Sequence, residues 1–189
     1  MGAPISIAGP TASGKSAVAM KIAEHLKGEI ISVDSMQVYR GLDIGTAKPS
    51  ADEQAAIRHH LIDCVGLEET YDAARFVREA TERETKIERP IFCGGTGLYF
   101  QAWHEGLGDS PQANAEVRAA IEAMDPEARL AELKATDPVM FERIDQQNPR
   151  RVVRALEVIR LTGKPFSQQR PEWQNTVPAN FFLIERERA

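Results

Sequence analysis

Residues 9–16 of the 189-residue chain read Gly9-Pro10-Thr11-Ala12-Ser13-Gly14-Lys15-Ser16, and they are the strongest indication of its fold. It matches the pattern G-x-x-x-x-G-K-[ST], in which backbone N–H groups, a lysine and a hydroxyl surround a phosphate group. The apolar residues 4–8 before it are typical of a buried parallel strand, and residues 16–26 after it carry apolar side chains at helical spacing. Strand, glycine-rich loop and helix in this order predict a binding site for a diphosphate or triphosphate.

The expected site has a distinct role for each kind of group in the loop. Lys15 supplies a full positive charge, and the Ser16 hydroxyl is a candidate ligand of Mg²⁺, the one cofactor that we expect. The alternative is a glycine-rich turn with a surface lysine. The candidate diphosphate-binding residues are Gly9, Thr11, Ala12, Ser13, Gly14, Lys15 and Ser16.

Working outward, the remaining pattern predicts an α/β protein with a P-loop NTPase-like core, in which a parallel sheet is flanked by helices. Strands are expected at residues 29–34, 90–93 and 180–184, and helices at 16–26, 73–86, from 97 onward, and at 150–161. After Gly106 the sequence pattern changes to a loop followed by short helices. Pro126 and Pro138, which directly follow Asp125 and Asp137, are expected to be first helical residues. We therefore expect a core formed by 1–106 and 148–189, and a small helical insertion at 107–147.

Charge is distributed unevenly along the chain. The formal net charge is −5, yet residues 143–170 contain seven Arg or Lys against two acidic residues, so a local basic patch lies on an acidic protein. No apolar run has the length of a membrane span, and we expect a cytoplasmic monomer without a membrane partner. Cys64 and Cys93 form no metal-binding pattern, and His59 and His60 are expected to be structural.

Five further segments accompany the loop in a fixed order. They are Asp34-Ser-Met-Gln-Val-Tyr39, Asp43-Ile-Gly-Thr-Ala-Lys48-Pro49, His59-His60-Leu-Ile-Asp63, Gly94-Gly-Thr96-Gly-Leu-Tyr99, and Arg151-Val-Val-Arg154-Ala-Leu-Glu-Val158 with Thr162-Gly-Lys-Pro165. From residue 4 to about residue 170 the chain resembles the tRNA dimethylallyltransferases. The resemblance implies transfer of a dimethylallyl group from dimethylallyl diphosphate to the exocyclic amine of the adenine beside the tRNA anticodon.

The resemblance also implies residue roles. Asp34 would act as the general base that takes the proton of the poorly nucleophilic amine, and Thr96 would contact the target nucleotide. The loop would then hold the diphosphate leaving group instead of ATP. The implied tRNA contacts, with the anticodon stem-loop as partner, are Asp34, Ser35, Met36, Gln37, Thr96, Arg118, Arg150, Arg151, Val152, Val153 and Arg154.

Simpler roles compete with each of these assignments. Asp34 could cap a turn or bind Mg²⁺ through water, and Thr96 could be a helix N-cap. Arg118 and the arginines of the 150–161 helix could belong to solvated helix faces. Members of the resembled family continue well beyond the equivalent of Ala189, so we expect either a short member or part of a longer chain.

Three rival functions share some of these features. Adenylate isopentenyltransferases use the same loop and base on a free nucleotide, but they need neither an arginine-rich helix nor a helical insertion. A small-molecule or nucleotide kinase would bind ATP in the loop. A non-catalytic nucleotide- or RNA-binding module is the third alternative.

Overall fold

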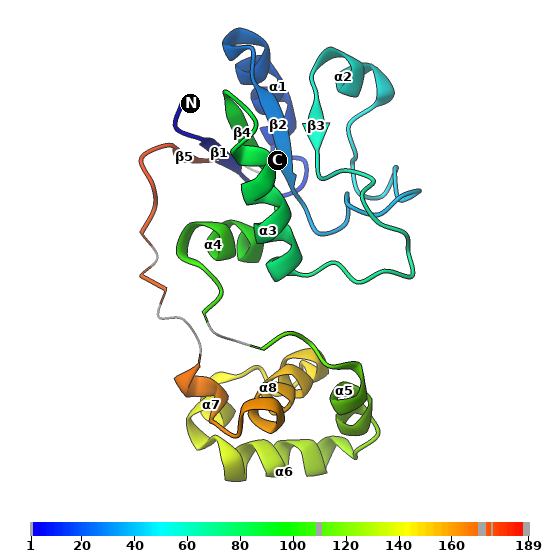
Figure 1. Ribbon diagram of the computed structural model, residues 1–189, viewed down its shortest axis with the longest axis vertical. Helices are drawn as coiled ribbons and strands as arrows, with labels where there is room; N and C mark the ends of the chain where they lie inside the picture. Colours follow the sequence, from blue (N-terminus) through cyan, green and yellow to red (C-terminus); the bar gives the residue numbers. More distant parts are fainter. Residues whose placement is uncertain (1, 109–110, 170–172, 175, 187–189) are drawn as a thin grey trace. The chain divides into compact units, whose positions relative to one another are not determined.

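The computed structural model describes residues 2–108, 111–169, 173–174 and 176–186 (Figure 1). The chain divides into two compact units. Unit 1 comprises Met1–Gly106 and Trp173–Ala189, and unit 2 comprises Leu107–Glu172. Arg170, the last residue of the basic stretch, lies outside the described residues.

Unit 1 is built on a five-stranded parallel sheet with the order β3-β2-β4-β1-β5. The strands are β1 (Ile5–Ala8), β2 (Glu29–Val33), β3 (His59–His60), β4 (Pro90–Gly94) and β5 (Phe181–Leu183). The expectation of a parallel sheet is confirmed. The two-residue strand β3 is too short to carry a hydrophobic pattern, and it was not predicted from the sequence.

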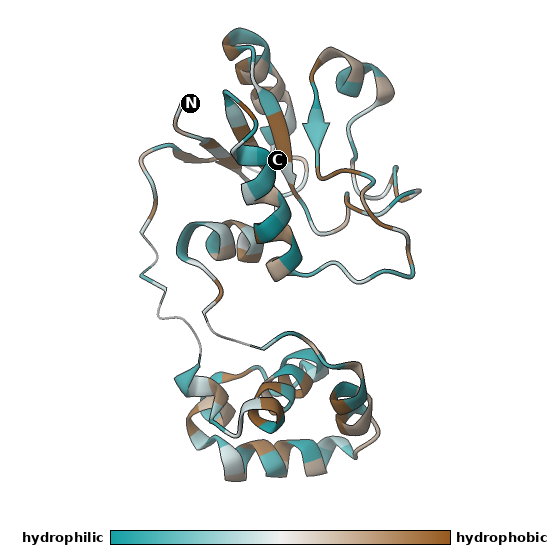
Figure 2. Ribbon diagram, in the orientation of Figure 1, coloured by the Kyte–Doolittle hydropathy of each residue, from teal (hydrophilic) through white to brown (hydrophobic). Residues whose placement is uncertain are grey.

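Alternate residues of the central strands point to opposite faces of this sheet, and helices cover both faces. Ile30 and Ile91 pack in a cluster with Ala19 and Ala23 of α1 (Lys15–Leu26). Their neighbours Ile31 and Phe92 pack in a second cluster, with side chains from α3 (Ala73–Glu84) and α4 (Gly97–Glu105). Figure 2 shows hydrophobic residues along β2 and a largely hydrophilic α3, as this arrangement requires.

Unit 2 consists of α-helices whose first turns are capped by side chains, and of a 3₁₀ turn without such a cap. They are α5 (Ala115–Glu122), α6 (Pro126–Thr136), α7 (Pro138–Arg143), α8 (Pro149–Thr162) and a 3₁₀ turn at Phe166–Gln168. Asp125 accepts a hydrogen bond from the Glu127 N–H, and Asp137 accepts one from the Met140 N–H. The expectation that Pro126 and Pro138 begin helices behind these residues is confirmed.

The expected boundary of the helical insertion, residue 147, is wrong. We assigned the 150–161 helix to the α/β core, but α8 packs against α5 and α6 and belongs to unit 2. Val152, Val153, Leu156 and Ile159 of α8 form a hydrophobic cluster with side chains of the preceding helices. The physical reason is the amphipathicity of the short helices, whose apolar faces need a longer central helix to cover them.

Candidate functional site

Three neighbouring strands of unit 1 bring the candidate catalytic residues to one edge of the sheet. Strand β4 lies between β2 and β1, and all three run in the same direction. Residues 9–16 follow β1, Asp34 follows β2, and Thr96 follows β4 by two residues. The carboxyl ends of parallel strands are where open α/β sheets bind their ligands.

The phosphate loop has the backbone conformation of an anion-binding turn. Ala12 has φ +65° and Gly14, the N-cap of α1, has φ +89°, a left-handed value that glycine adopts without steric strain. The Lys15 ammonium donates to the Pro10 carbonyl at 3.2 Å, which folds its side chain back over the loop. The Ser13 hydroxyl is buried and has no hydrogen-bond partner among the described residues. An incoming phosphate oxygen would satisfy it.

The thiol of Cys93 in β4 marks how closely these elements approach each other. Burial raises the pKa of Cys93 to about 11, while the Lys15 charge and a hydrogen bond with Ser16 oppose the rise and the Asp34 charge adds to it. The loop lysine, the loop hydroxyl and the candidate base thus all affect the pKa of this one buried thiol. The predicted residues Lys15, Ser16 and Asp34 therefore lie near one another, around the Cys93 thiol.

Asp34 is held by hydrogen bonds within its own turn, and Thr96 by a hydrogen bond that joins the ends of β2 and β4. One oxygen of Asp34, Oδ1, accepts from the Met36 N–H at 2.8 Å and the Gln37 N–H at 3.3 Å. Within the described chain Oδ2 makes no hydrogen bond, so it is available to a substrate. The Thr96 hydroxyl accepts from the Ser35 N–H at 3.0 Å. Asp34 thus caps its own turn and still presents one oxygen.

The backbones of β2 and β4 approach each other closely just before Thr96. Thr96 occupies the N-cap position of α4, but its side chain makes no capping bond and bonds to Ser35 instead. Its N–H donates to the Val33 carbonyl at 3.1 Å. A Cβ on Gly94 would lie 2.0 Å from the Val33 oxygen, so only glycine fits between the two strands.

The loop after Asp34 is fixed by Gln37 and Lys48. The Gln37 amide accepts from the Ser32 hydroxyl at 2.8 Å and donates to the carbonyls of Thr46 and Ala47 at 3.1 Å. The expected reading of an adenine edge by Gln37 therefore competes with bonds that this amide already makes. Lys48 had no role predicted from the sequence, although it belongs to one of the five ordered segments.

Lys48 is the internal cation of that loop. Its side chain is 3% exposed and bonds to Asp63 at 2.6 Å, to Asp43 at 2.7 Å and to the Tyr39 carbonyl at 2.9 Å. Burial by itself would lower the pKa of Lys48, but the two carboxylates outweigh it and raise the pKa. Lys48 therefore stays charged and ties the loop to the segment after β3.

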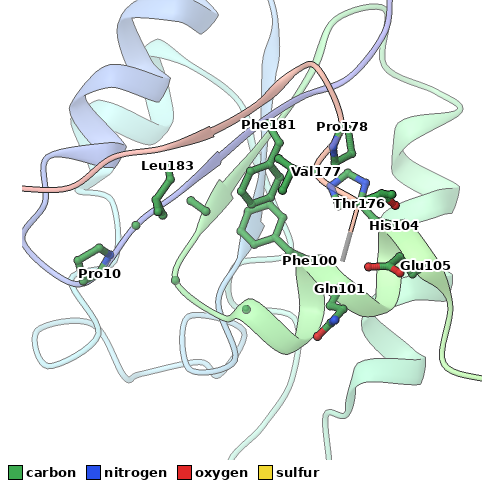
Figure 3. Close-up of a pocket in the computed structure, with 14 residues that line it drawn as sticks. Pro10, Phe100, Gln101, His104, Glu105, Thr176, Val177, Pro178, Phe181 and Leu183 are labelled. Carbon is green, nitrogen blue, oxygen red and sulfur yellow. The ribbon is translucent and has the colours of Figure 1, made fainter. Parts of the chain in front are cut away.

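An apolar cavity of about 550 Å³ borders the phosphate loop on the β5 side (Figure 3). Pro10 lies at one end of it, and the rings of Phe100 and Phe181 meet edge to face in its wall, with centroids 5.2 Å apart. His104 and Glu105 of α4 supply its polar side. The cavity offers apolar surface next to an anion-binding loop.

The candidate RNA-binding residues of unit 2 fall into three groups. Arg150 and Arg151 at the start of α8 are exposed and make no ion pair within the described chain. Arg118 and Arg154 both bind the Glu157 carboxylate. Val152 and Val153 are each 4% exposed and pack in the core, so their side chains add no surface to an RNA-binding face.

The Ser16 hydroxyl is the candidate protein contact for Mg²⁺. Among the described residues no cluster of three or more His, Cys, Asp or Glu side chains could hold a metal ion. The Ser16 hydroxyl beside a bound diphosphate suits Mg²⁺, which keeps several waters and prefers phosphate oxygens to all-protein cages.

No described helix is both long and apolar enough to span a membrane.

Comparison with known proteins finds a family model and several named relatives. Residues 37–189 match the family model described as IPP transferase. The tRNA dimethylallyltransferase of Hydrogenovibrio crunogenus is 48% identical over 188 residues, which are 96% of this chain and 58% of that protein. The enzyme of the same name from Halorhodospira halophila is 48% identical over 202 residues, which cover all of this chain and 65% of that protein. This chain thus spans about three fifths of these relatives' length.

Solved structures agree with this similarity. The full-length tRNA isopentenylpyrophosphate transferase of Bacillus halodurans aligns with a TM-score of 0.54 and 43% identity, covering 86% of this chain and 57% of that one. A eukaryotic dimethylallyltransferase acting on tRNA aligns with a TM-score of 0.73 and 29% identity, covering 96% of this chain and 48% of that one.

Proposed function

Because the chain belongs to the IPP transferase family, we propose that it transfers a dimethylallyl group from dimethylallyl diphosphate to the exocyclic amine of the adenine beside the tRNA anticodon. A C–N bond forms, the allylic C–O bond breaks, the amine loses a proton and diphosphate leaves. With a tRNA as the substrate, we place this activity in the cytoplasm and expect a monomer.

The observation that carries this proposal is the meeting of a phosphate loop, a carboxylate and a hydroxyl at three adjacent strand ends. Transfer of an allyl group needs charge stabilisation where diphosphate departs and a base where the proton leaves. Lys15 and Ser16 satisfy the first need and Asp34 the second. Lys15, Ser16 and Asp34 all affect the pKa of the Cys93 thiol, so they lie near one group, which supports their acting on one substrate pair.

In this assignment the loop binds the leaving group. Lys15, the Ser13 hydroxyl and the backbone N–H groups at the start of α1 would hold the diphosphate, and the developing negative charge on oxygen would strengthen these contacts. The Ser16 hydroxyl would hold Mg²⁺, which would supply further charge neutralisation for the departing diphosphate. The apolar cavity beside Pro10 would accommodate the prenyl chain.

Asp34 and Thr96 would act on the nucleotide. The two N–H bonds at Oδ1 hold the Asp34 carboxylate in place, and Oδ2 would accept the proton of the adenine amine. The Thr96 hydroxyl would orient the base while its bond to Ser35 keeps the two strand ends together. Arg118, Arg150, Arg151 and Arg154 would contact RNA phosphates, which position an RNA without reading its sequence.

A labelled-substrate assay tests the proposal. The protein is incubated with radiolabelled dimethylallyl diphosphate, Mg²⁺ and either an adenine-containing anticodon stem-loop or AMP. Label in the stem-loop alone is expected. Label in AMP alone would instead indicate an adenylate isopentenyltransferase, and transfer of the γ-phosphate of ATP would indicate a kinase. Binding of the stem-loop without any transfer would leave a non-catalytic RNA-binding module.

A further inference from the structure

We propose that Glu157 is a positioning residue that holds Arg118 and Arg154 side by side as a preformed clamp for one phosphate of the RNA backbone. This inference rests on the proposed function, because it assumes that unit 2 contacts RNA. It adds a residue that none of the site assignments above includes.

The Glu157 carboxylate is fully buried, and both of its oxygens accept hydrogen bonds. Its side chain is 0% exposed, Oε1 accepts from the Asn114 N–H at 2.8 Å, and Oε2 accepts from Arg118 Nη2 at 3.0 Å and Arg154 Nη1 at 2.7 Å. Because both guanidinium groups bind the same oxygen, they must lie next to each other. One negative charge therefore fixes two positive charges that would otherwise repel.

The two arginines remain accessible while they are held. The side chain of Arg118 is 41% exposed and that of Arg154 is 30% exposed. A second bond, from Arg154 Nη2 to the Pro111 carbonyl at 2.6 Å, fixes the plane of the Arg154 guanidinium. Each guanidinium has five N–H donors, so both keep donors for a further acceptor. The group of three side chains carries a net charge of +1 at neutral pH.

Stability alone is a poor explanation for this arrangement. A carboxylate buried among the apolar side chains that surround α8 must overcome a large desolvation penalty, and apolar replacements of buried ion pairs are often as stable. Holding α5 to α8 would also need only one arginine. A second arginine, left partly exposed, is what recognition of an anion requires, because arginine binds phosphate through paired, directed N–H bonds.

Arg160 in the same helix provides an internal comparison. It makes two bonds to Glu132, at 2.8 and 2.6 Å, so that pair is electrically neutral. Glu132 and Glu157 therefore make the same kind of contact with α8 arginines, but only the Glu157 group has an excess of positive charge. This makes Glu132 a matched control for Glu157.

Simple electrostatics and positioning predict opposite results for Glu157→Gln. If Glu157 acts only as a negative charge near RNA, its removal strengthens binding of an anticodon stem-loop. If it positions the clamp, the neutral amide loses its hold on both arginines and binding weakens, on the order of tenfold, as expected for loss of hydrogen bonds to a charged group. Glu132→Gln removes the same charge from the same unit, and we expect it to leave binding unchanged or slightly tighter.

The experiment measures stem-loop binding by fluorescence anisotropy over a series of salt concentrations, for the wild type and both variants, with circular dichroism as the check on folding. For Glu157→Gln we expect weaker binding and a shallower dependence of log affinity on log salt. In the transfer assay the KM for RNA should rise while the KM for dimethylallyl diphosphate is unchanged. A Glu157→Gln protein that binds RNA as well as Glu132→Gln overturns the inference.

A second set of variants keeps the test decisive if Glu157→Gln fails to fold. Arg118→Lys and Arg154→Lys keep the charge beside Glu157 but replace the planar fork with a single ammonium group, so they should weaken RNA binding several-fold. Arg160→Lys, which makes the same change in the neutral pair with Glu132, should have no such effect. Equal binding by all three contradicts the clamp. A wild type that binds no RNA would instead contradict the proposed function.

Discussion

Two groups of residues place their functional groups by different means: the strand-end site of unit 1 (Lys15, Ser16, Asp34 and Thr96) and the arginine face of unit 2 (Arg118, Arg150, Arg151 and Arg154). In unit 1 the backbone does so: Asp34 and Thr96 are fixed by N–H groups next to two strands whose distance the sheet dictates. In unit 2, Arg118 and Arg154 are held by the side chain of Glu157, which is itself buried. Side chains held by the backbone suit chemistry that needs exact geometry. Long side chains held by a carboxylate suit the recognition of a flexible, charged partner.

The largest expected effect tests the strand-end site. Asp34→Asn keeps an acceptor for the Met36 and Gln37 N–H groups but cannot take a proton, so turnover should fall by roughly 10²- to 10⁴-fold. Single-turnover prenylation of a stem-loop measures this fall in turnover. RNA binding and folding should scarcely change. Asp52→Asn, at an exposed position of α2 (Ala51–Ala56), is the charge-matched control and should keep full activity. An Asp34→Asn enzyme with an unchanged rate would remove Asp34 as the base.

Loss of the loop's side-chain groups should have the next largest effect. Lys15→Ala and Ser16→Ala should lower kcat by on the order of 10²-fold and raise the KM for dimethylallyl diphosphate, because both groups contact the diphosphate before and during its departure. Chelation of Mg²⁺ should reproduce the Ser16 change. Lys21→Ala, on the exposed side of the same helix, is the control. Unaltered steady-state kinetics for Lys15→Ala would show that the loop does not hold the leaving group.

The arginine face should show a smaller effect that depends on salt. Arg150 and Arg151 can be replaced by Ala without exposing a buried carboxylate, which Arg154→Ala would do. The double variant should bind a stem-loop more weakly, and the slope of log affinity against log salt should flatten by roughly 0.7–0.9 for each RNA phosphate that the variant no longer neutralises. Dimethylallyl diphosphate binding should stay the same.

The matched control for this variant lies in unit 1. Arg78 and Arg83 are exposed on α3, so their replacement by Ala changes the net charge equally at a site with no proposed RNA contact. If this control flattens the salt dependence as much as the α8 variant does, the effect comes from net charge and the arginine face has no special role.

The smallest expected effect is a difference in how the two units respond to pH. Burial by itself would raise the pKa of Glu157, but bonds from Arg154, Asn114 and Arg118 outweigh it and lower the pKa below the ordinary value of 4.5. Its contribution to stability is therefore present above pH 4.5 and is lost as the pH falls through the lower folded value. The Cys93 pKa is instead raised from 9.0 to about 11, so its contribution is present below pH 9 and is lost as the pH rises toward 11.

The two units can be followed separately during such a titration. Trp103, Trp173 and the tyrosines all belong to unit 1, and the sequence of residues 107–172 contains neither Trp nor Tyr. Tryptophan fluorescence should therefore report the alkaline transition, and far-UV circular dichroism should report the acid loss of helix in unit 2. Cys93→Ala should reduce the alkaline transition, and Glu157→Gln should reduce the acid loss of helix. Coincident transitions by both probes would show that the units unfold together.

The sequence predicted the elements of unit 1 well because each has a local cause. The G-x-x-x-x-G-K-[ST] pattern sets the loop, and apolar runs or helical periods set β1, β2, β4, α1 and α3 to within two residues. The prolines behind Asp125 and Asp137 located two helix starts for the same reason. Strand β3 was missed because its pairing with β2, and not its own two residues, defines it.

A phosphate loop in an α/β unit, a carboxylate after the next strand and a basic helix could all be predicted from the sequence, because these features depend on residues that are neighbours in the chain. Which distant groups meet depends on the tertiary structure. It placed β4 between β2 and β1, so that Thr96 bonds to Ser35 across 61 positions of sequence. In the tertiary structure α8 belongs to unit 2, and Arg118 binds Glu157 across 39 positions of sequence. Such pairings depend on how whole hydrophobic faces pack, which no short pattern encodes.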